Sequence, residues 1–152
     1  MLVREIMSTQ PICCLATDTI QHAASLMRQH EVGALPVVES QNHRRLLGIV
    51  TDRDLCVRLI ADGAGPSTPV SRAMTPNPIT CNSNDSLAVC ESLMQTHAVR
   101  RLPVVNDVGI CIGMVAQADV VLHDNAHNVQ RTLMAISKPD GGAEHQRAIL
   151  SA

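Results

Sequence analysis

The stretch Gly48-Ile49-Val50-Thr51-Asp52-Arg53-Asp54 joins a predicted strand to a predicted helix. A short apolar run ends at Val50, a hydroxyl and two carboxylates follow, and residues 55–61 have a helical pattern. A helix start leaves backbone N–H groups unpaired, and these groups and the helix dipole favour an anion. Thr51 can donate its hydroxyl to a phosphate, and the Asp54 carboxylate can accept hydrogen bonds from a ribose diol. Both residues are also common helix caps, and this stretch alone favours capping.

The chain contains this stretch twice. Gly113-Met114-Val115-Ala116-Gln117-Ala118-Asp119 repeats the glycine, the apolar pair and the final aspartate. Upstream, Val-Gly-Ala-Leu-Pro-Val-Val at 32–38 returns as Val-Arg-Arg-Leu-Pro-Val-Val at 99–105. The two copies are offset by 67 residues upstream but by 65 at the glycine, so the first carries two extra residues in the polar segment 39–45. Polar loops tolerate such changes in length, so the sequence indicates an internal duplication.

Each half resembles a CBS motif, and the two together resemble a CBS-domain pair, or Bateman module, of the stand-alone bacterial type. The resemblance rests on the Leu-Pro-Val-Val strand and the Gly-Ile-Val-Thr-x-x-Asp ending, and it covers roughly residues 3–124. It implies an α+β fold of tandem CBS motifs, β-α-β-β-α each, packed with pseudo-twofold symmetry. We expect motif 1 at 1–63, a linker at 64–71, motif 2 at 72–125, and a C-terminal helix and tail at 126–152.

The composition is that of a folded protein without aromatic side chains. Of 152 residues, 45% are hydrophobic and none is Phe, Tyr or Trp, so Val, Ile, Leu, Ala and Met must form the core. Without aromatic stacking platforms or a basic stripe, and with a net charge of −2, the chain is not expected to bind nucleic acid or an anionic membrane. No apolar run could span a bilayer and no signal peptide is evident, so we expect a cytoplasmic protein.

The six cysteines are expected to be reduced and structural. They form no CxxC pair, and Cys13 and Cys14 would point to opposite faces of a strand, a poor geometry for a metal. The others fall in apolar runs or beside strands, where small core residues are expected: Cys56, Cys81, Cys90 and Cys111.

In the first half we expect a short helix or turn at 3–7, strands at 12–15, 34–38 and 46–50, and two helices. The first helix is capped within 17–19 and ends at His30-Glu31, and the second ends at Gly63. Pro36 suggests that 34–38 is an edge strand or begins a strand.

The second half repeats this order. We expect strands at 79–82, 102–105 and 110–115, a turn at Asn106-Asp107, and a helix from Gln117. Asp85 or Ser86 caps a helix that presents Leu87, Cys90 and Met94 on one face. Residues 126–137 read as a further helix, and 143–152 as a short helix or frayed tail.

In family members that bind adenine nucleotides, two clefts lie between the halves. Each takes a ribose-binding aspartate from one half and the adenine-facing backbone mainly from the other. Carried over by alignment, the first cleft comprises Ile49, Thr51, Arg53 and Asp54, with Met74, Ile79, Val99 and Arg100 opposite. The second comprises Arg101, Met114 and Asp119, with Met7, Ile12, Val32 and Gly33 opposite.

The two clefts are not expected to bind equally well. The first keeps Thr51 but has Ala34 where the family often has a phosphate-binding basic residue, a charge that Arg53 or Arg100 would replace. The second keeps Arg101 but has Ala116 where the family has Ser or Thr. A lost charge-assisted hydrogen bond costs about 1.5–3 kcal/mol, or one to two orders of magnitude in affinity, so the first cleft is favoured. Arg100 and Arg101 are either a solvated or ion-paired loop pair or, as we favour, an anion site.

Two further functions were weighed. His123 and His127 would share one face of a continuous helix with Asp124 nearby, which makes them weak zinc candidates, although Asn125 is a candidate helix end between them. We therefore assign no metal. The chain has no P-loop, GxSxG, HExxH or dinucleotide fingerprint, and Asp52 and Asp54 point in different directions, so we expect no enzyme.

The sequence therefore predicts a regulatory module. An adenine nucleotide of the AMP, ADP or ATP type would change the packing of the halves, and an unidentified protein partner would read the change through differential affinity. S-adenosylmethionine, NAD and cyclic dinucleotides remain open as ligands, and no cofactor is required. CBS pairs commonly form dimers through their helices, so a homodimer is expected. The alternatives are a ligand-free dimeric interaction module and a zinc-binding CBS protein.

Overall fold

A computed structural model describes residues 1–137, so the expected short helix or tail at 143–152 lies outside the described residues. The chain divides into two compact units. Within the described residues, unit 1 consists of residues 1–8, 79–104 and 113–137, and unit 2 of residues 9–78 and 105–112. Each sequence repeat therefore contributes segments to both units.

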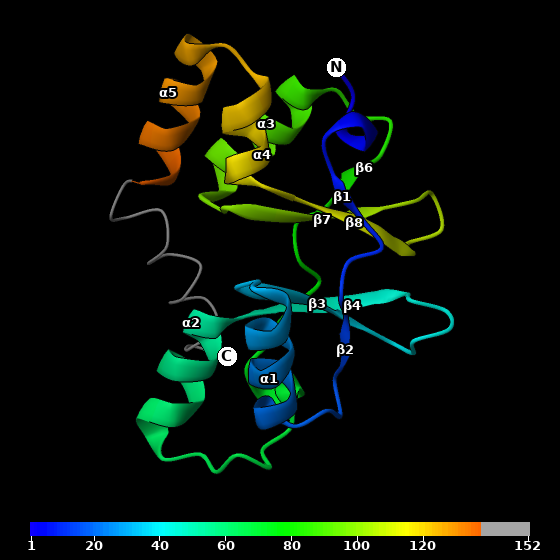
Figure 1. The fold of residues 1–152 in the computed structure, drawn as a ribbon, viewed down its shortest axis with the longest axis vertical. Coiled ribbons are helices and arrows are strands. Elements are labelled where there is room, and N and C mark those ends of the chain that lie inside the picture. Colours follow the sequence, from blue (N-terminus) through cyan, green and yellow to red (C-terminus); the bar gives the residue numbers. More distant parts are fainter. Residues whose placement is uncertain (138–152) are drawn as a thin grey trace. The chain divides into compact units, whose positions relative to one another are not determined.

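The sheet of unit 2 has four strands in the order β2-β3-β4-β5, namely Cys14–Leu15, Ala34–Val38, Leu46–Thr51 and Thr75–Pro76. β3 and β4 form an antiparallel hairpin in which Ala34 lies opposite Thr51, β2 runs parallel to β3, and β5 runs antiparallel to β4. Helix α1 (Ile20–His30) and the helical segment that begins with α2 (Asp52–Asp54) lie on one side of this sheet (Figure 1). Strand and helix side chains meet there in a buried core that includes Ile20, Met27, Leu35, Val37, Val50, Leu55 and Leu59.

Pro36 lies in a strand with neighbours on both sides, so the expectation of an edge strand or a strand start is wrong. β2 pairs only with Val37 and Val38. At the level of Pro36, β3 therefore has a strand neighbour only on the β4 side, where Ile49 lies opposite. A proline has no N–H to donate to a second neighbouring strand. Here β2 does not extend as far as Pro36, so no such hydrogen bond is needed.

The helices of unit 2 begin and end where the sequence predicts. Thr19 caps α1, since its hydroxyl oxygen accepts a hydrogen bond from the His22 N–H at 3.1 Å. After α2 the helix widens into a π-type segment at Leu55–Leu59 and tightens into a 3-10 turn at Ile60–Asp62. Gly63 ends it in the left-handed conformation with φ 76°. Residues 64–71 then run along the start of α1, where the Ile20 N–H donates to the Thr68 carbonyl at 2.8 Å.

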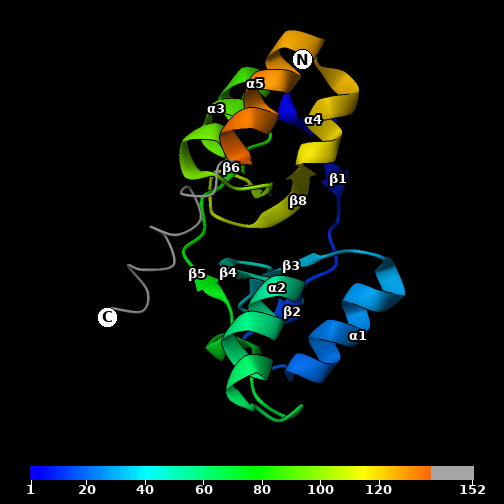
Figure 2. The ribbon, with the colours of Figure 1, turned by 90° about the vertical axis from the view of Figure 1, so that its left-hand side faces the viewer.

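Unit 1 contains a second four-stranded sheet in the order β1-β8-β7-β6, namely Ser8–Thr9, Cys111–Ala116, Arg101–Val105 and Cys81–Asn82. A 3-10 turn at Val3–Glu5 precedes β1. Helices α3 (Leu87–His97), α4 (Gln117–His123) and α5 (Ala126–Ile136) lie on one side of the sheet (Figures 1 and 2). Ser86 caps α3, and the predicted apolar face of that helix is buried: Leu87, Cys90 and Met94.

Helix α5 packs against α3 within unit 1. The Gln95 side-chain amide donates to the Thr132 hydroxyl at 2.8 Å, and Thr132 and Ile136 are buried. Glu91 is buried beside them with only 4% of its surface exposed. The region that follows the repeats is therefore part of the core of unit 1 as far as Ile136.

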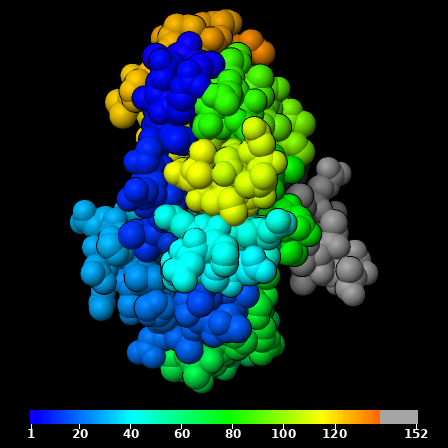
Figure 3. Space-filling view, turned by 90° about the vertical axis from the view of Figure 1, so that its right-hand side faces the viewer, coloured from blue at the N-terminus to red at the C-terminus, as the bar shows by residue number. Residues whose placement is uncertain are grey.

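The β7–β8 turn at 105–112 belongs to unit 2. It forms at the predicted Asn106-Asp107 position, where the Gly109 N–H donates to the Asn106 carbonyl at 2.9 Å. The turn contacts the loop of the first hairpin, since Leu46 N–H donates to the Gly109 carbonyl at 3.1 Å. Figure 3 shows this contact, with the turn in yellow and the loop in cyan.

Five of the six cysteines are buried, as predicted for small core residues, and Cys56 is exposed. The core expectation for Cys56 is wrong because Leu55 and Leu59 occupy the buried face of that helical segment. Within residues 1–137, no helix has both the length and the apolar character needed to cross a membrane.

Candidate functional site

Asp54 and Thr51 cap the helix that follows β4. The Asp54 N–H donates to the Thr51 hydroxyl oxygen at 3.1 Å, and the Thr51 N–H donates to Asp54 Oδ2 at 2.9 Å. Both residues are half-buried. The capping role favoured by the local sequence is therefore present, while the Thr51 hydroxyl proton remains available for a ligand.

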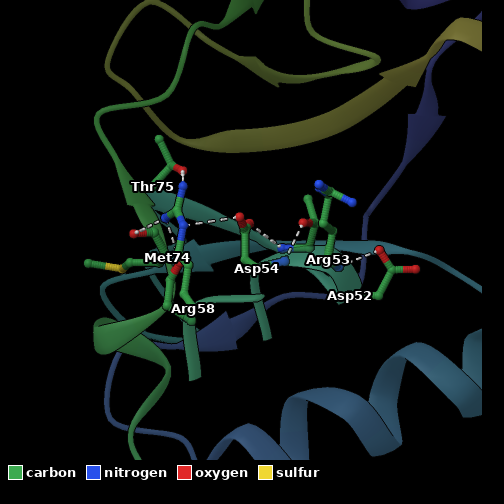
Figure 4. A network of polar contacts seen from close by, with 8 residues as sticks. Asp52, Arg53, Asp54, Arg58, Met74 and Thr75 are labelled. Atoms are coloured by element: carbon green, nitrogen blue, oxygen red, sulfur yellow. Dashed lines mark hydrogen bonds and ion pairs between the residues drawn. The ribbon is translucent and has the colours of Figure 1, made fainter. Parts of the chain in front are cut away.

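Arg58 is a residue of this site that the sequence reasoning missed. Its Nε lies 3.4 Å from Asp54 Oδ1, and its Nη1 donates to the Ala73 carbonyl at 2.8 Å (Figure 4). Its Nη2 also reaches the Thr75 hydroxyl at 3.4 Å. The spacing of four residues between Asp54 and Arg58 on a helix was the signal that could have revealed the pair.

Arg58 therefore joins the start of the helix to the segment that enters β5. Asp54 has both carboxylate oxygens engaged, Oδ2 by its capping bond and Oδ1 by the guanidinium. A ribose diol at Asp54 would have to share the second oxygen with Arg58.

Met74, expected opposite Asp54 in the first cleft, lies in the same unit as Asp54, and its place in a ligand site stays a prediction. Met74 lies in that unit because β5 extends the sheet beside β4 with Thr75 opposite Ile49. The approach is close at Gly48, where a Cβ atom would lie 2.9 Å from the Thr75 carbonyl oxygen and 3.0 Å from Met74 Sδ. The signature glycine is thus needed for strand contact.

The same arrangement occurs in unit 1. Met7 lies beside Gly113, where a Cβ atom would lie 2.6 Å from Met7 Sδ, and it belongs to the same unit as Asp119. β1 is the neighbour of β8 in the sheet, which explains the position. In both copies the methionine precedes a short strand that pairs beside the glycine.

The second copy differs at the helix start. The Ala116 N–H donates to Asp119 Oδ2 at 2.7 Å, which matches the bond between Thr51 and Asp54. Ala116 has no hydroxyl, so α4 begins without a side-chain cap. The position that corresponds to Arg58 is His123, whose Nδ1 lies 2.7 Å from the Asp119 carbonyl oxygen. Among residues 1–137, Asp119 forms no ion pair, and its Oδ1 has no partner.

A groove of about 540 Å³ lies at this helix start within unit 1. It is lined by Arg100, Arg101, Ala116, Gln117, Ala118, Val121 and Leu122. The Arg100 carbonyl accepts a hydrogen bond from the Gln117 N–H at 2.8 Å, which fixes the backbone of the arginine pair beside α4. Both arginines are exposed, and with the described residues neither forms an ion pair. The ion-paired alternative for Arg100 and Arg101 therefore fails within the described chain.

The remaining predicted residues are divided between the units. Ile49 and Arg53 lie in unit 2 with Asp54, and the rest of the first set lies in unit 1: Ile79, Val99 and Arg100. In the second set, Arg101, Met114 and Asp119 lie in unit 1, and the rest lies in unit 2: Ile12, Val32 and Gly33. Within unit 2, the Gly33 carbonyl accepts a hydrogen bond from the Asp52 N–H at 3.1 Å.

The zinc candidates lie on two different helices. Helix α4 ends at His123, Asp124 is extended with φ −116°, and Asn125 caps α5, which contains His127. The continuous helix needed to bring the two imidazoles together does not form. No group of three or more His, Cys, Asp and Glu side chains suited to a metal occurs in the part of the chain that is described.

Comparison with known proteins yields one family. The model of the CBS domain matches residues 3–61 and 70–125. The CBS domain-containing protein YhcV of Bacillus subtilis is 42% identical over 121 residues, which are 80% of this chain and 84% of that protein. Hypoxic response protein 1 of Mycobacterium tuberculosis is 32% identical over 137 residues, which are 90% of this chain and 94% of that protein.

Solved structures of similar proteins contain two kinds of ligand. Hypoxic response protein 1 with two coordinated zinc ions has a TM-score of 0.73 and 31% identity, and covers 82% of this chain and 100% of its own. CBSX2 in complex with AMP has a TM-score of 0.69 and 27% identity, with 80% and 93% coverage. The CBS pair of MJ0100 in complex with 5′-methylthioadenosine and S-adenosyl-L-methionine has a TM-score of 0.73 and 27% identity, with 80% and 94% coverage.

Proposed function

The chain belongs to the CBS domain family, and from this premise we propose that it is a regulatory module that binds an adenosine-containing nucleotide and signals to a protein partner. The fold of the family is a widespread scaffold, so the proposal depends on the residues of the site and not on the fold alone. AMP is the first ligand to consider, because CBSX2 carries it at 27% identity.

The groove at the start of α4 is the observation that supports the proposal best. Two arginines without ion-pair partners among the described residues, Arg100 and Arg101, are among the residues that line it, and guanidinium groups are suited to the bidentate binding of phosphate. Asp119 is the third residue of α4 and directly follows the groove-lining residue Ala118, and we propose that its Oδ1 accepts hydrogen bonds from a ribose diol. These groups together match the two polar ends of a nucleoside phosphate.

The structure changes which set of residues we favour. In the first set, which includes Thr51, Arg53 and Asp54, the ribose-binding carboxylate already pairs with Arg58. In the second set, Asp119 has no such competitor in the described chain, although Ala116 lacks a hydroxyl. We therefore propose that the set around Arg101 and Asp119 is the stronger site, and that the set around Asp54 is the weaker one.

Signalling would follow from the difference in ligand affinity between two arrangements of the module. A protein partner that prefers one arrangement would then bind more or less tightly when the nucleotide is present. Exposed apolar side chains on the helices are compatible with a homodimer: Val57, Ile60, Leu122 and Met134. We propose that the module acts in the cytoplasm without catalysis.

Isothermal titration of the full chain with AMP, ATP, S-adenosylmethionine and Zn²⁺ tests the proposal. We expect one of the adenosine compounds to bind, and Asp119→Asn to lower the affinity about 10- to 100-fold, since a charge-assisted bond of about 1.5–3 kcal/mol is lost. Asp54→Asn is the matched control and should cost less. A larger loss in Asp54→Asn would return the preference to the first set.

Two outcomes would overturn the proposal. If no adenosine compound binds the folded protein at millimolar concentration, a ligand-free dimeric interaction module replaces the sensor. If Zn²⁺ alone binds, the module is a metal-binding one, as in the zinc-containing structure of Hypoxic response protein 1. Thermal shift gives an independent readout, because a ligand at a hundredfold its Kd stabilises the folded state by about 2.7 kcal/mol.

A further inference from the structure

Cys13 and Cys111 form a buried pair in unit 2. Cys13 directly precedes β2, and Cys111 begins β8 in the segment 105–112. They share a small buried cluster with Val38, and their side chains are hydrogen-bonded to each other. The two residues come from different sequence repeats, and the proposed nucleotide site uses neither of them.

Arg44 brings a positive charge to this pair. Its Nη2 donates to Cys13 Sγ at 3.1 Å and also donates to the Pro11 carbonyl. Its own carbonyl accepts a hydrogen bond from the Cys111 N–H at 2.9 Å. The arginine is therefore fixed by its backbone at one cysteine and by its side chain at the other.

The Arg44 guanidinium lacks an anionic partner among the described carboxylates. Arg44 forms no ion pair within residues 1–137, and its Nε is buried without a hydrogen-bond partner. Its backbone is held in the left-handed region with φ 52°, where a residue other than glycine is uncommon. A thiolate at Cys13 would supply the missing negative charge.

The electrostatics of Cys13 agree with this geometry. The hydrogen bond with Cys111 and then the hydrogen bond and charge of Arg44 lower the pKa of Cys13 from 9.0 to about 7, although burial opposes them. The neighbouring thiol behaves in the opposite way, since burial and then the Asp18 charge raise the pKa of Cys14 to about 12.

We propose that Cys13 is an oxidation site, at which a thiolate held by Arg44 reacts with a hydroperoxide and then forms a disulfide with Cys111. Cys13 is only 6% exposed, so an oxidant that reaches its sulfur must be small, and hydrogen peroxide is only slightly larger than water. The thiolate is the reactive form, and a nearby cation and hydrogen-bond donor maintain it near neutral pH.

The reaction balances with hydrogen peroxide as the oxidant. The Cys13 thiolate attacks one peroxide oxygen, the O–O bond breaks, and the products are a Cys13 sulfenic acid and hydroxide. The Cys111 sulfur then attacks the sulfenic sulfur, the S–O bond breaks, and the departing hydroxide leaves as water with the Cys111 thiol proton. Each cysteine loses one electron, and the peroxide gains two as it becomes water.

The second cysteine pair provides an internal comparison. Cys81 and Cys90 in unit 1 are also buried and hydrogen-bonded to each other. The hydrogen bond with Cys90 lowers the pKa of Cys81, burial and the Asp85 charge oppose that shift, and no guanidinium contributes to the pKa of either thiol. A pair without a cation should react more slowly, so the presence of two adjacent thiols is not sufficient.

Oxidation of the full chain followed by peptide mass spectrometry tests the proposal. The reduced protein is treated with hydrogen peroxide at neutral pH, and the remaining thiols are blocked before digestion. We expect the Cys13–Cys111 disulfide to form first, and the Cys81–Cys90 and Cys56 peptides to stay reduced at the same dose. Cys111→Ser should stop at the Cys13 sulfenic acid, which dimedone labels.

Arg44→Gln tests the role of the cation by a pH profile. The Cys111 hydrogen bond remains in this variant, so the loss of Arg44 raises the pKa of Cys13 only part of the way from about 7 toward 9. At about pH 7 the thiolate fraction falls, the more basic sulfur is intrinsically more nucleophilic, and oxidation should slow by up to about fivefold. At about pH 10 both proteins hold a thiolate, and the variant should react faster. A structural effect of the substitution would not produce this crossover.

A measurement on the wild-type protein tests the proposal even if a variant fails to fold. The rate of Cys13 alkylation by iodoacetamide should rise with an apparent pKa near 7. The proposal is overturned if Cys13 titrates like an ordinary thiol, if Cys56 or Cys81 oxidises first, or if Cys13 forms its disulfide with a cysteine other than Cys111.

Discussion

Replacement of Gly48 by alanine should destabilise the protein, because β5 runs too close to β4 for an added methyl group. The new Cβ would lie 2.9 Å from the Thr75 carbonyl oxygen and 3.0 Å from Met74 Sδ. The carbonyl belongs to the backbone of β5, so it cannot move away without loosening the pair between Ile49 and Thr75. The contact is therefore relieved only by a loss of strand pairing.

Two opposing effects set the magnitude. Overpacking at a buried position costs about 1–3 kcal/mol, whereas the stiffer unfolded chain returns about 0.4–1 kcal/mol. The net loss for Gly48→Ala is about 1–2 kcal/mol, which lowers the Tm of a chain of this length by about 2–8 °C. Urea unfolding at fixed temperature, with the slope m unchanged, measures it.

The second repeat supplies a matched control. At Gly113 the shortest contact of an added Cβ, 2.6 Å, is with Met7 Sδ, the end of a flexible side chain, and the backbone oxygen of Ser8 is farther away at 3.1 Å. A double-mutant cycle of Gly113→Ala with Met7→Ala should therefore show a favourable coupling energy. The corresponding cycle of Gly48→Ala with Met74→Ala should show little. If Gly48→Ala is as stable as the wild type, or if Met74→Ala rescues it fully, the close approach of β5 is refuted.

Two further predictions concern charged side chains. Burial raises the pKa of the Glu91 carboxyl above its ordinary 4.5, and a hydrogen bond that the protonated Glu91 donates to the Asp124 carboxylate adds to the shift. The folded state then holds the proton more tightly than the unfolded chain, so this stabilisation is complete below about pH 4.5 and is lost as the pH rises through the raised pKa. Glu91→Gln should flatten that part of the stability curve in urea titrations, and an unchanged curve would contradict the assignment. Arg58→Met should lower the free energy of unfolding by about 1–2 kcal/mol, because it removes the ion pair with Asp54 and the hydrogen bond to the buried Ala73 carbonyl. The control Arg53→Met, at an exposed side chain, should change it by no more than about 0.5 kcal/mol. Equal shifts of the urea midpoint in the two variants would refute the proposed stabilising role of Arg58.

Local signals in the sequence predicted most of the elements. A Ser or Thr hydroxyl can accept a hydrogen bond from a backbone N–H in the first turn of the helix that follows it. Thr19 and Ser86 therefore marked the two helix starts correctly. The duplicated Leu-Pro-Val-Val strands appear where the repeat placed them, and the break between α4 and α5 falls at Asn125, which was already a candidate helix end. These features depend on contacts a few residues apart.

Long-range pairing accounts for what the sequence did not reveal. The positions of Met7 and Met74 depend on which strand each lead-in segment joins, and side-chain periodicity carries no information about that choice. The role of Pro36 likewise depended on the length of β2, a strand elsewhere in the chain. Arg58 was different, since its spacing from Asp54 was visible but the family motif ends at the aspartate.

The substitution Ala116→Thr should stabilise the protein, because it restores a cap that the first repeat already has. Ala116 has φ −105° and ψ 159°, close to the φ −114° and ψ 162° of Thr51, so a threonine fits this backbone without strain. In the first copy the Thr51 hydroxyl accepts a hydrogen bond from the Asp54 N–H at 3.1 Å, and the Asp119 N–H has no such side-chain acceptor.

The expected gain is that of an N-cap, about 0.5–1 kcal/mol, measured by urea unfolding. Ala116→Val is the control, since valine has nearly the shape of threonine but no hydroxyl, and it should not give this gain. The hydroxyl would also line the groove beside Arg101, so the same variant should bind a nucleoside phosphate more tightly if the proposed site is correct. A gain in stability without a gain in affinity would confirm the cap but place the ligand elsewhere, and equal stability of the two variants would show that packing, and not capping, limits this helix start.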